Sequence, residues 1–475
     1  MKYIRIGFLL TLFSICLSQE TTFKVSVKLM PETYFESGNY EYLRGNYKDA
    51  VFYYSKAIEG KPDYLEAFLY RGGAKFKLQE YWGAIWDYNK AIKLYGNDNP
   101  EAAVAFADRG IIRAHLEDYL GAIKDYDKAI ELYGEDNPEA TKTFFNRGHA
   151  KSDLEDYKGA IVDYNIAIDL RPDYADAFNN RGNAKYYLGD YQGAIEDCDK
   201  AIELYGEDNL EAAEAFNNRG LAKGKLKDYE GAIADYDEAI RLKPDYADAF
   251  YNHGLAKNKL KDNKGAIEDC DKAIVLYGEN NPEAADAFTN RGLAKVELED
   301  YAGAIEDYDE AIRLKPDFVV ATYNRGIAKG NLGRYDEAIL DYDRAIELKP
   351  DYADAFTYRG NVFLVKGDYS AAKSDYENAL RINPEHAYAN MSLGCLALFE
   401  ERLDDAYIAL KRAVELNETI KKEIVGYEGI TEVITYWLEE SPVKAEEVRA
   451  KINAIIAPEK LPEPSEENEN KSEEE

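Results

Sequence analysis

Basic and acidic side chains recur at fixed distances from a series of glycines. Around Gly182 the basic residues are Arg181, directly before the glycine, and Lys185, three residues after it. An aspartate stands fifteen residues after most of these glycines, and the series is Asp87, Asp125, Asp163, Asp197, Asp235, Asp269, Asp307, Asp341 and Asp375. Guanidinium and ammonium groups bind carboxylates and free anions alike, so the spacing allows an internal ion pair or an anion-binding surface.

Helix geometry favours the internal ion pair. At about 100° per residue, Phe178, Arg181, Gly182 and Lys185 share one face of a helix, and that face packs on a neighbouring helix. Folding the chain back after a turn places Asp197 level with the glycine, between the two cations. We therefore predict a buried or half-buried ion ladder of this kind, repeated along the chain. The alternative is a basic groove for anions, but each set of cations has a matching acid at a fixed distance.

An asparagine two residues before the glycine lies roughly 150° away from that packing face. It recurs in six successive repeats, as Asn146, Asn180, Asn218, Asn252, Asn290 and Asn324. A carboxamide both donates and accepts hydrogen bonds, which suits the peptide group of a ligand whatever its side chains are. The residues one after the glycine would line the same surface, and they include Leu221, Leu255, Leu293 and Ile327. The residues six before the glycine would give it an acidic rim, at Asp176, Glu214, Asp248 and Asp286.

Two interpretations of the asparagine series stay open. It is either a peptide-binding ladder or a consensus residue of the repeat, inherited by duplication without any ligand. Asp108 and Tyr358 stand at the same position in flanking repeats and break the series. A binding function would therefore be restricted to the repeats between Gly148 and Gly326.

The glycines mark a repeat of 34 or 38 residues, and they are Gly38, Gly72, Gly110, Gly148, Gly182, Gly220, Gly254, Gly292, Gly326, Gly360 and Gly394. An alanine stands twelve residues after each glycine and another stands nineteen after it, as in Ala194 and Ala201. These small and aromatic positions follow helical spacing in two segments, separated by a turn such as "LGDY". Each repeat is therefore predicted to be a pair of helices, and because one pair cannot bury both its faces, neighbouring pairs must stack.

This pattern resembles the tetratricopeptide repeat over most of the chain, from Glu32 to Asn417. The resemblance implies an all-α fold, a right-handed α-solenoid (superhelix) of about eleven helix-pair repeats with C-terminal capping helices. It also implies that the asparagine side of each first helix lines a concave groove. The series is similar to the asparagine ladder with which some family members, such as the O-linked GlcNAc transferases, hold the backbone of an extended peptide.

The longer repeats carry four extra residues in acidic loops such as "LYGEDNP". Their glycines are predicted to end helices, at Gly96, Gly134, Gly206 and Gly278. Asparagines before a proline are predicted to start the next helix, at Asn99, Asn137 and Asn281. Cation binding is the functional alternative, but the spacing of an EF-hand calcium loop is missing, so solvated loops are predicted.

The remaining segments lie at the two ends of the chain. Residues 1–18 have the basic start and short apolar run of a secretory signal peptide. Residues 19–31 are predicted to be a short extended segment, residues 418–457 capping helices and residues 458–475 a disordered acidic tail. We therefore expect a secreted or periplasmic protein; the alternative is a lipid anchor at Cys16, which would hold it at the membrane.

Composition and scattered reactive residues argue against several classes of function. With 91 acidic and 59 basic residues the net charge is −32, which disfavours a nucleic-acid partner. The histidines occupy different repeat positions without a nucleophile or ligand motif, at His115, His149, His253 and His386. No pair of cysteines has metal-ligand spacing, and Cys198 and Cys270 are predicted to be buried free thiols. We expect neither catalysis nor a cofactor nor a metal site.

The sequence therefore predicts a non-enzymatic interaction scaffold that binds an extended peptide, basic or apolar, in its concave groove. The alternative is an envelope structural or assembly component that docks a folded partner through its edges or its acidic tail. One repeat is predicted to be a softer point of the solenoid, because His253 replaces the usual arginine and Asn263 the usual tyrosine.

Overall fold

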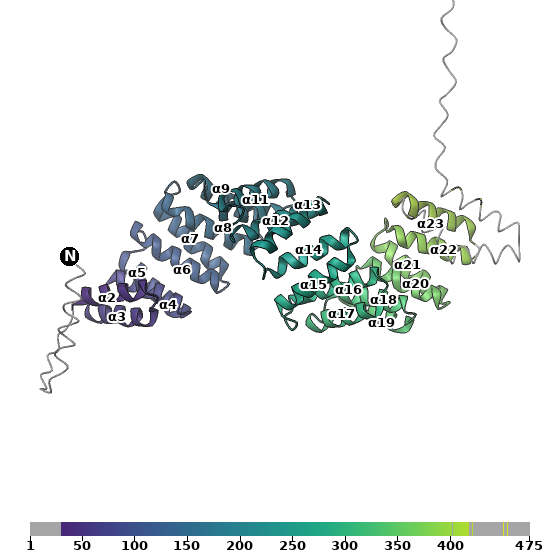
Figure 1. The fold of residues 1–475 in the computed structure, drawn as a ribbon, viewed down its shortest axis with the longest axis horizontal. Coiled ribbons are helices and arrows are strands. Elements are labelled where there is room, and N and C mark those ends of the chain that lie inside the picture. Colours follow the sequence, from purple (N-terminus) through teal and green to yellow (C-terminus); the bar gives the residue numbers. More distant parts are fainter. Residues whose placement is uncertain (1–29, 401, 418–419, 421–449, 451–453, 455–475) are drawn as a thin grey trace, which may run out of the picture. The chain divides into compact units, whose positions relative to one another are not determined.

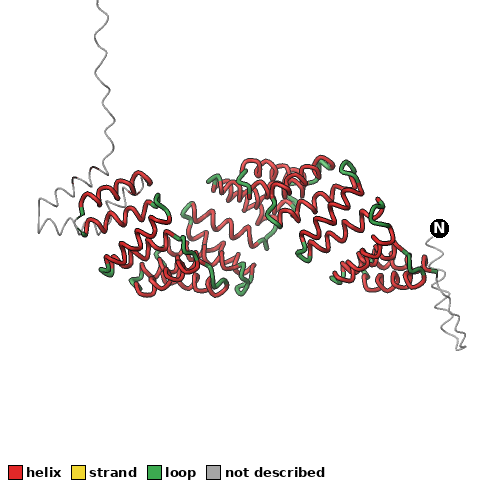
Figure 2. Tube along the Cα trace, turned by 180° about the vertical axis from the view of Figure 1, so that it is seen from behind, coloured by secondary structure: helices red, strands yellow, loops and turns green. Residues whose placement is uncertain are grey.

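The computed structural model describes residues 30–400, 402–417, 420, 450 and 454. These residues form α-helices and two short 3-10 helices, and no strand occurs among them (Figure 2). The predicted all-α fold is confirmed. The chain divides into two compact units, residues 1–207 and residues 208–475.

The first unit contains five helix pairs, each spanning one repeat (Figure 1). They are α2 (Pro31–Leu43) with α3 (Tyr47–Gly60), α4 (Leu65–Lys77) with α5 (Tyr81–Tyr95), α6 (Ala103–His115) with α7 (Tyr119–Tyr133), α8 (Thr141–Asp153) with α9 (Tyr157–Leu170), and α10 (Ala175–Tyr187) with α11 (Tyr191–Tyr205). The 3-10 helices η1 (Pro100–Ala102) and η2 (Pro138–Ala140) precede α6 and α8.

The second unit contains six helix pairs among its described residues. They are α12 (Ala212–Lys225) with α13 (Tyr229–Leu242), α14 (Ala247–Lys259) with α15 (Asn263–Tyr277), α16 (Ala284–Glu297) with α17 (Tyr301–Leu314), α18 (Val319–Asn331) with α19 (Tyr335–Leu348), α20 (Ala353–Val365) with α21 (Tyr369–Ile382), and α22 (Ala387–Phe399) with α23 (Leu403–Leu416). Within each unit, the second helix of a pair also packs on the first helix of the next pair, so the pairs stack as a solenoid.

The repeat glycine lets the two helices of a pair approach each other. A methyl group in place of a hydrogen on Gly110 would lie 2.6 Å from the ring of Tyr126, which comes sixteen residues later. The second helix presents a cysteine instead of this tyrosine in one repeat of each unit. At Gly182, for example, the same methyl group would lie 3.1 Å from the carbonyl oxygen of Ala194 and 3.2 Å from the sulfur of Cys198. The cysteines therefore take the place of a packing aromatic, and Cys198, Cys270 and Cys395 are buried free thiols, as predicted for the first two.

Local capping groups explain where the helices begin and end. The second residue after the first helix adopts a positive φ, as at Gly189 (83°) and, less favourably for a side chain, Lys227 (66°). The second helix then often starts with an aspartate cap, as where Asp190 accepts a hydrogen bond from the backbone N–H of Gly193. As predicted, the loop glycines end helices with positive φ, at Gly96, Gly134, Gly206 and Gly278. Asn99 and Asn137 cap the 3-10 helices η1 and η2 as predicted, whereas Asn281 accepts a hydrogen bond from Glu283 N–H but α16 begins only at Ala284.

Several predicted segments lie wholly or largely outside the described residues. They are the signal peptide (1–18), nearly all of the extended segment (19–31), the capping helices (418–457) and the acidic tail (458–475). Pro31, predicted as the last residue of the extended segment, is instead the first residue of α2. This start suits proline because the first turn of a helix needs no hydrogen bond from its backbone nitrogen.

Candidate peptide-binding face

In the repeats from Gly72 to Gly360, basic side chains of the first helix and the aspartate of the second helix form an ion cluster between the two helices of a pair. In the repeat of Gly182, Arg181 Nη2 lies 2.5 Å from Asp197 Oδ1, and Lys185 Nζ lies 2.8 Å from Asp197 Oδ2. The Asp197 side chain is only 5% exposed. Equivalent clusters centre on Asp87, Asp125, Asp163, Asp235, Asp307 and Asp341, and Asp375 pairs with its arginine alone. The predicted ion ladder is confirmed.

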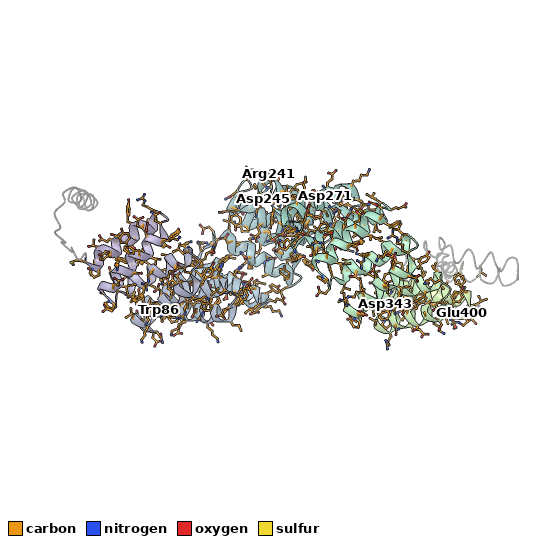
Figure 3. All side chains as sticks on the ribbon, turned by 90° about the horizontal axis from the view of Figure 1, so that it is seen from below. Trp86, Arg241, Asp245, Asp271, Asp343 and Glu400 are labelled. Carbon is orange, nitrogen blue, oxygen red and sulfur yellow. The ribbon has the colours of Figure 1, made fainter. Side chains whose placement is uncertain are left out.

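The same arginines also connect neighbouring repeats, which the sequence analysis missed. Arg181 Nη1 donates a hydrogen bond to Asn165 Oδ1 of the preceding repeat, at 2.6 Å. The accepting residue follows the preceding glycine by seventeen positions, and the other acceptors are Ser55, Asn89, Asp127, Asp271, Asp309 and Asp343. Asp271 and Asp343 are marked in Figure 3. The sequence did carry a signal for this link, because the residue seventeen after the glycine is polar in each of these repeats.

The electrostatics of the clusters hold these cations in the charged state. Burial alone would lower the pKa of Arg147, but hydrogen bonds and charge from Asp163 and Asp127 raise it above its usual value. The same balance raises the pKa of Arg325 beside Asp341. The N–H donors of these guanidinium groups are therefore used within the fold, and the clusters do not form the alternative basic groove for anions.

The cluster around Gly254 is the variant one. His253 replaces the arginine, and its Nδ1 lies 3.0 Å from Asp269 Oδ2 while its Nε2 lies 3.6 Å from Asp237 Oδ1. Burial opposes ionisation of Asp269, but the nearby His253 imidazole and the hydrogen bond from Lys257 outweigh it and lower the pKa of this carboxyl group. The imidazole thus reaches the carboxylates of both repeats, but it lacks the two parallel N–H groups with which arginine holds one carboxylate.

The side of the first helices that carries the residue two before the glycine is called here the asparagine face. Asn146 and Asn180 lie on it in the first unit, on α8 and α10. Asn218, Asn252, Asn290 and Asn324 lie on it in the second unit, on α12, α14, α16 and α18. Asn218 and Asn290 are buried, with 9% and 5% of their surface exposed, and the other four are half-buried.

Amide contacts link successive first helices of the second unit along this face. Asn252 Nδ2 donates a hydrogen bond to Asn217 Oδ1 at 3.0 Å, and Asn258 Nδ2 donates to Asn290 Oδ1 at 2.6 Å. Asn290 Nδ2 in turn contacts the sulfur of Cys270 at 3.4 Å. The sequence analysis did not single out Asn217 or Asn258, because neither recurs along the chain as the series does. Part of the asparagine series therefore serves the packing between repeats.

The apolar and acidic residues predicted around this face are placed as follows. Leu221 and Leu255 are half-buried, while Leu293 is 36% exposed. The acidic rim is partly engaged within each repeat, since the hydroxyl group of Tyr277 donates a hydrogen bond to Asp248 and Lys315 Nζ lies 2.7 Å from Asp286. The peptide-binding role of all these residues remains a prediction.

The histidines are spread over separate surroundings in the described residues. His115 Nε2 lies 2.6 Å from the hydroxyl group of Tyr81, and His386 caps α22 while its Nε2 lies 2.9 Å from Asp354. His149 is exposed. Within the part of the chain that the structure describes, no three His, Cys, Asp or Glu side chains gather as a metal site would require. No described helix is both long and apolar enough to cross a membrane.

Family models match this architecture over much of its length. Models described as "TPR repeat" and "Tetratricopeptide repeat" match residues 148–189, 173–245, 217–285, 292–333, 331–367 and 353–386. The chain contains tetratricopeptide repeats. Such repeats are scaffolds for protein–protein interaction, and the four matching models all describe this repeat.

Solved tetratricopeptide-repeat structures are similar to parts of the chain. YrrB, a repeat protein with an unusual peptide-binding site, is 28% identical over 41% of this chain and 96% of its own, with a TM-score of 0.34. Yeast Tom70 is 17% identical over 88% of this chain and 99% of its own, with a TM-score of 0.41. Cut9–Hcn1 of the APC/C is 12% identical over 82% of this chain and 94% of its own, with a TM-score of 0.45. No curated protein matches the sequence.

Proposed function

We propose that the protein is a non-enzymatic scaffold that binds an extended peptide on the asparagine face of its tetratricopeptide repeats. The observation that carries this proposal is the recurrence of a carboxamide at one position of four consecutive first helices in the second unit, from Asn218 to Asn324. A row of carboxamides offers donors and acceptors at regular intervals, which matches the regular peptide groups of an extended chain.

The ion clusters support this assignment by leaving the asparagine face as the surface for recognition. The arginine before each repeat glycine and the lysine after it are held by buried carboxylates between the helices. These cations are therefore not available to a ligand. Leu293, which is 36% exposed, would add an apolar contact for the ligand on the same face. The acidic rim at Asp248 favours a peptide that is basic or apolar rather than acidic.

We also propose that the protein is exported, on the basis of its N-terminal sequence. The basic start and the apolar run Ile6 to Leu17 have the organisation of a secretory signal. N-terminal sequencing of the protein from its native cells tests this proposal. A chain that begins near Gln19 supports it, and a chain that retains Met1 contradicts it.

An array of immobilised peptides, followed by affinity measurements on the best binder, tests the peptide-binding proposal. Asn252 and Asn324 are the residues to change, since both are half-buried, whereas Asn290 is buried and bonded to Asn258. Because Asn252 also donates to Asn217, exchange of the α12 and α14 amides is measured alongside, to show that the variant keeps its repeat packing. The double variant N252A/N324A is expected to weaken binding roughly tenfold or more, because each lost hydrogen bond is worth about 1 kcal/mol. N378A on the second helix α21 is the matched control and should bind as the natural chain does.

Backbone recognition has a second signature in the ligand itself. Methylating the central amide nitrogens of the best peptide removes donors without changing its charge or side chains. Affinity should fall for the natural chain, while N252A/N324A should lose little more. Equal affinity of the N252A/N324A and natural chains for the unmodified peptide would overturn the proposal and leave docking of a folded partner as the better function.

A further inference from the structure

The second helices of the first unit carry large apolar side chains that are exposed. Trp82 and Trp86 lie one turn apart on α5, and Trp82 is 76% exposed. The neighbouring second helices add Phe52 on α3 and Leu120 on α7, which, like Trp86, are exposed by half or more. All four stand ten or fourteen residues after a repeat glycine. The positions ten, fourteen and eighteen after each repeat glycine are called here the outer stripe.

The stacking of the helices turns the outer stripe of successive repeats to the same side of the unit. α4 packs between α3 and α5, and α6 packs in the same way between α5 and α7 (Figure 1). The ring of Trp86 also lies against Phe68 of α4, with 6.0 Å between the ring centres, and Phe68 belongs to the buried core. The indole ring is therefore supported from below while half of it remains open to solvent. Large apolar side chains that repeat on one side of a fold are typical of an interaction surface.

The outer stripe of the first four repeats is cationic, although the chain as a whole is acidic. No aspartate or glutamate stands at these positions of α3, α5, α7 and α9. In the second unit, by contrast, most repeats carry an acid there, as at Glu230, Glu306 and Asp336. The charged residues of the first four repeats are all lysines, at Lys48, Lys56, Lys90, Lys124, Lys128 and Lys158.

Two lysines of α5 are available to a partner. Lys90 and Lys93 follow Trp86 by four and seven residues, so they lie on the same side of the helix. Lys90 Nζ is 5.1 Å from the centre of the Trp86 ring, which places a cation beside an apolar surface. Within the described residues neither lysine forms an ion pair, and the single acid of α5, Asp87, is buried and held by two cations of α4.

The helices on either side of α5 carry acids at the position of Lys93. These acids are Glu59 on α3 and Glu131 on α7, and they neutralise neighbouring lysines: Lys56 Nζ lies 2.6 Å from Glu59 and Lys128 Nζ lies 2.9 Å from Glu131. A broad anionic surface such as a lipid bilayer would meet these carboxylates as well as the lysines. A single helix laid over α5 would meet the tryptophans and the unpaired lysines. The narrow cationic surface therefore favours a helix over a membrane.

We propose that α5 and the outer stripe beside it form a second interaction surface, with Trp82 and Trp86 as its anchors, and that its occupant is an acidic amphipathic helix of a partner protein. Exposed tryptophans dominate the binding energy of many protein interfaces. The apolar side of such a helix would cover the indole rings, and carboxylates along its edge would reach Lys90 and Lys93. This surface lies on second helices, so it does not depend on peptide binding by the asparagine face.

Two fluorophore-labelled peptides of leucine, glutamate and alanine test this surface in the full-length protein at physiological salt. Both are about 20 residues long, which is enough to form a helix in isolation. In the amphipathic probe the leucines lie along one side of the helix. In the scrambled probe the same residues are distributed around it, so net charge and composition are equal. The natural chain is expected to bind the amphipathic probe at least tenfold more tightly.

Trp82→Ala is the informative variant, because most of this side chain is exposed and its loss should disturb the packing little. It should weaken binding of the amphipathic probe at least tenfold. Leu340→Ala, an exposed apolar residue of the outer stripe in the second unit, is the matched control and should bind as the natural chain does. The charge reversal K90E/K93E should also weaken binding at least tenfold, whereas Lys272→Glu, in the outer stripe of α15, should not.

Equal binding of the two probes, or unchanged affinity in W82A and in K90E/K93E, would overturn the proposal. Binding to vesicles of phosphatidylcholine and phosphatidylserine that W82A abolishes would overturn it in favour of a membrane surface. Self-association in light scattering that W82A abolishes would overturn it in favour of a second copy of the chain. Array-peptide binding by N252A/N324A is measured separately, so failure of this surface and failure of the asparagine face are distinguishable.

Discussion

The two units share the same packing residues but differ on the asparagine face. Ion clusters of arginine, lysine and aspartate fill the helix pairs of both units with nearly identical distances. On the asparagine face, the first unit presents Glu36, Tyr70 and Asp108 before its asparagines begin, whereas the second begins with four asparagines in succession. Residues that must pair with each other across a helix pair are held constant, and residues that face outward have diverged.

This difference indicates that the interface between paired helices is more constrained than the asparagine face. A change in one member of an ion cluster strands a buried charge, so most repeats keep both cations, and the exceptions at Asp269 and Asp375 keep at least one. On the asparagine face, by contrast, the first unit carries an acid, Asp108, where the second unit keeps amides. Trp86, which is 50% exposed on α5 and marked in Figure 3, stands where the following second helices carry Lys124 and Val162, so this outer position also differs between repeats.

The largest effect is expected from breaking an ion cluster. Asp197→Ala leaves Arg181 and Lys185 without their shared carboxylate in a largely buried place, which should destabilise the first unit by about 3–5 kcal/mol. Hydrogen exchange of the α10 and α11 amides in the full-length chain measures this loss. Asp136→Ala, in an exposed loop of the same unit, should change little. Exchange of the α10 and α11 amides in D197A at the rate of the natural chain would show that the clusters do not stabilise the packing.

Asp108→Asn should act in the opposite direction and depend on pH. The folded-state pKa of about 6 lies above the ordinary value of 3.8, so the folded protein binds the proton more tightly than the unfolded chain does. The aspartate therefore costs stability as the pH rises from about 4 to above 6, by at most about 3 kcal/mol. D108N should be more stable than the natural chain at pH 7.5 and equal to it near pH 3.5, as measured by exchange of the α6 amides. An equal gain at both pH values would contradict a raised pKa.

The ion clusters were predictable from the sequence because both partners lie within one repeat. The positions of Arg181 and Asp197 relative to Gly182 follow from helical spacing and one turn. The link from Arg181 to Asn165 was not, because it depends on how one helix pair packs against the next, which periodicity within a repeat does not determine.

The asparagine face was predictable only in part. Its angular position follows from the helix period, but the burial of Asn290 depends on Asn258 and Cys270, which come from other helices. Asp108 was visible only as a break in the series. Burial raises the pKa of its carboxyl group, and that burial depends on how neighbouring helices pack, which the spacing within a repeat does not determine.

A smaller gain is expected from restoring the variant cluster of the second unit. His253→Arg should supply the bidentate pair to Asp269 and a second link to Asp237, and stabilise this unit by about 1 kcal/mol at pH 7.5. The lowered pKa of Asp269 contributes stability that is present above the ordinary carboxyl pKa and is lost as the pH falls through the folded value. H253R should therefore extend the acid side of the stability profile. The converse change, Arg219→His in the neighbouring repeat, should lower the stability of α12 and α13 by a similar amount, and a neutral result for both would mean that arginine and histidine are equivalent here.

The smallest effect distinguishes packing from recognition on the asparagine face itself. Asn258→Ala removes the hydrogen bond to Asn290 that joins α14 to α16, and should cost about 1 kcal/mol in the second unit. It leaves the carboxamides of Asn252 and Asn324 in place, so affinity for the best array peptide should change less than threefold. Exchange of the α14 and α16 amides and the peptide dissociation constant, measured on the same preparation, separate the two roles. A loss of affinity in N258A as large as in N252A/N324A would mean that the alanine changes act through repeat packing, and that the asparagine series is a consensus feature of the stack rather than a set of ligand contacts.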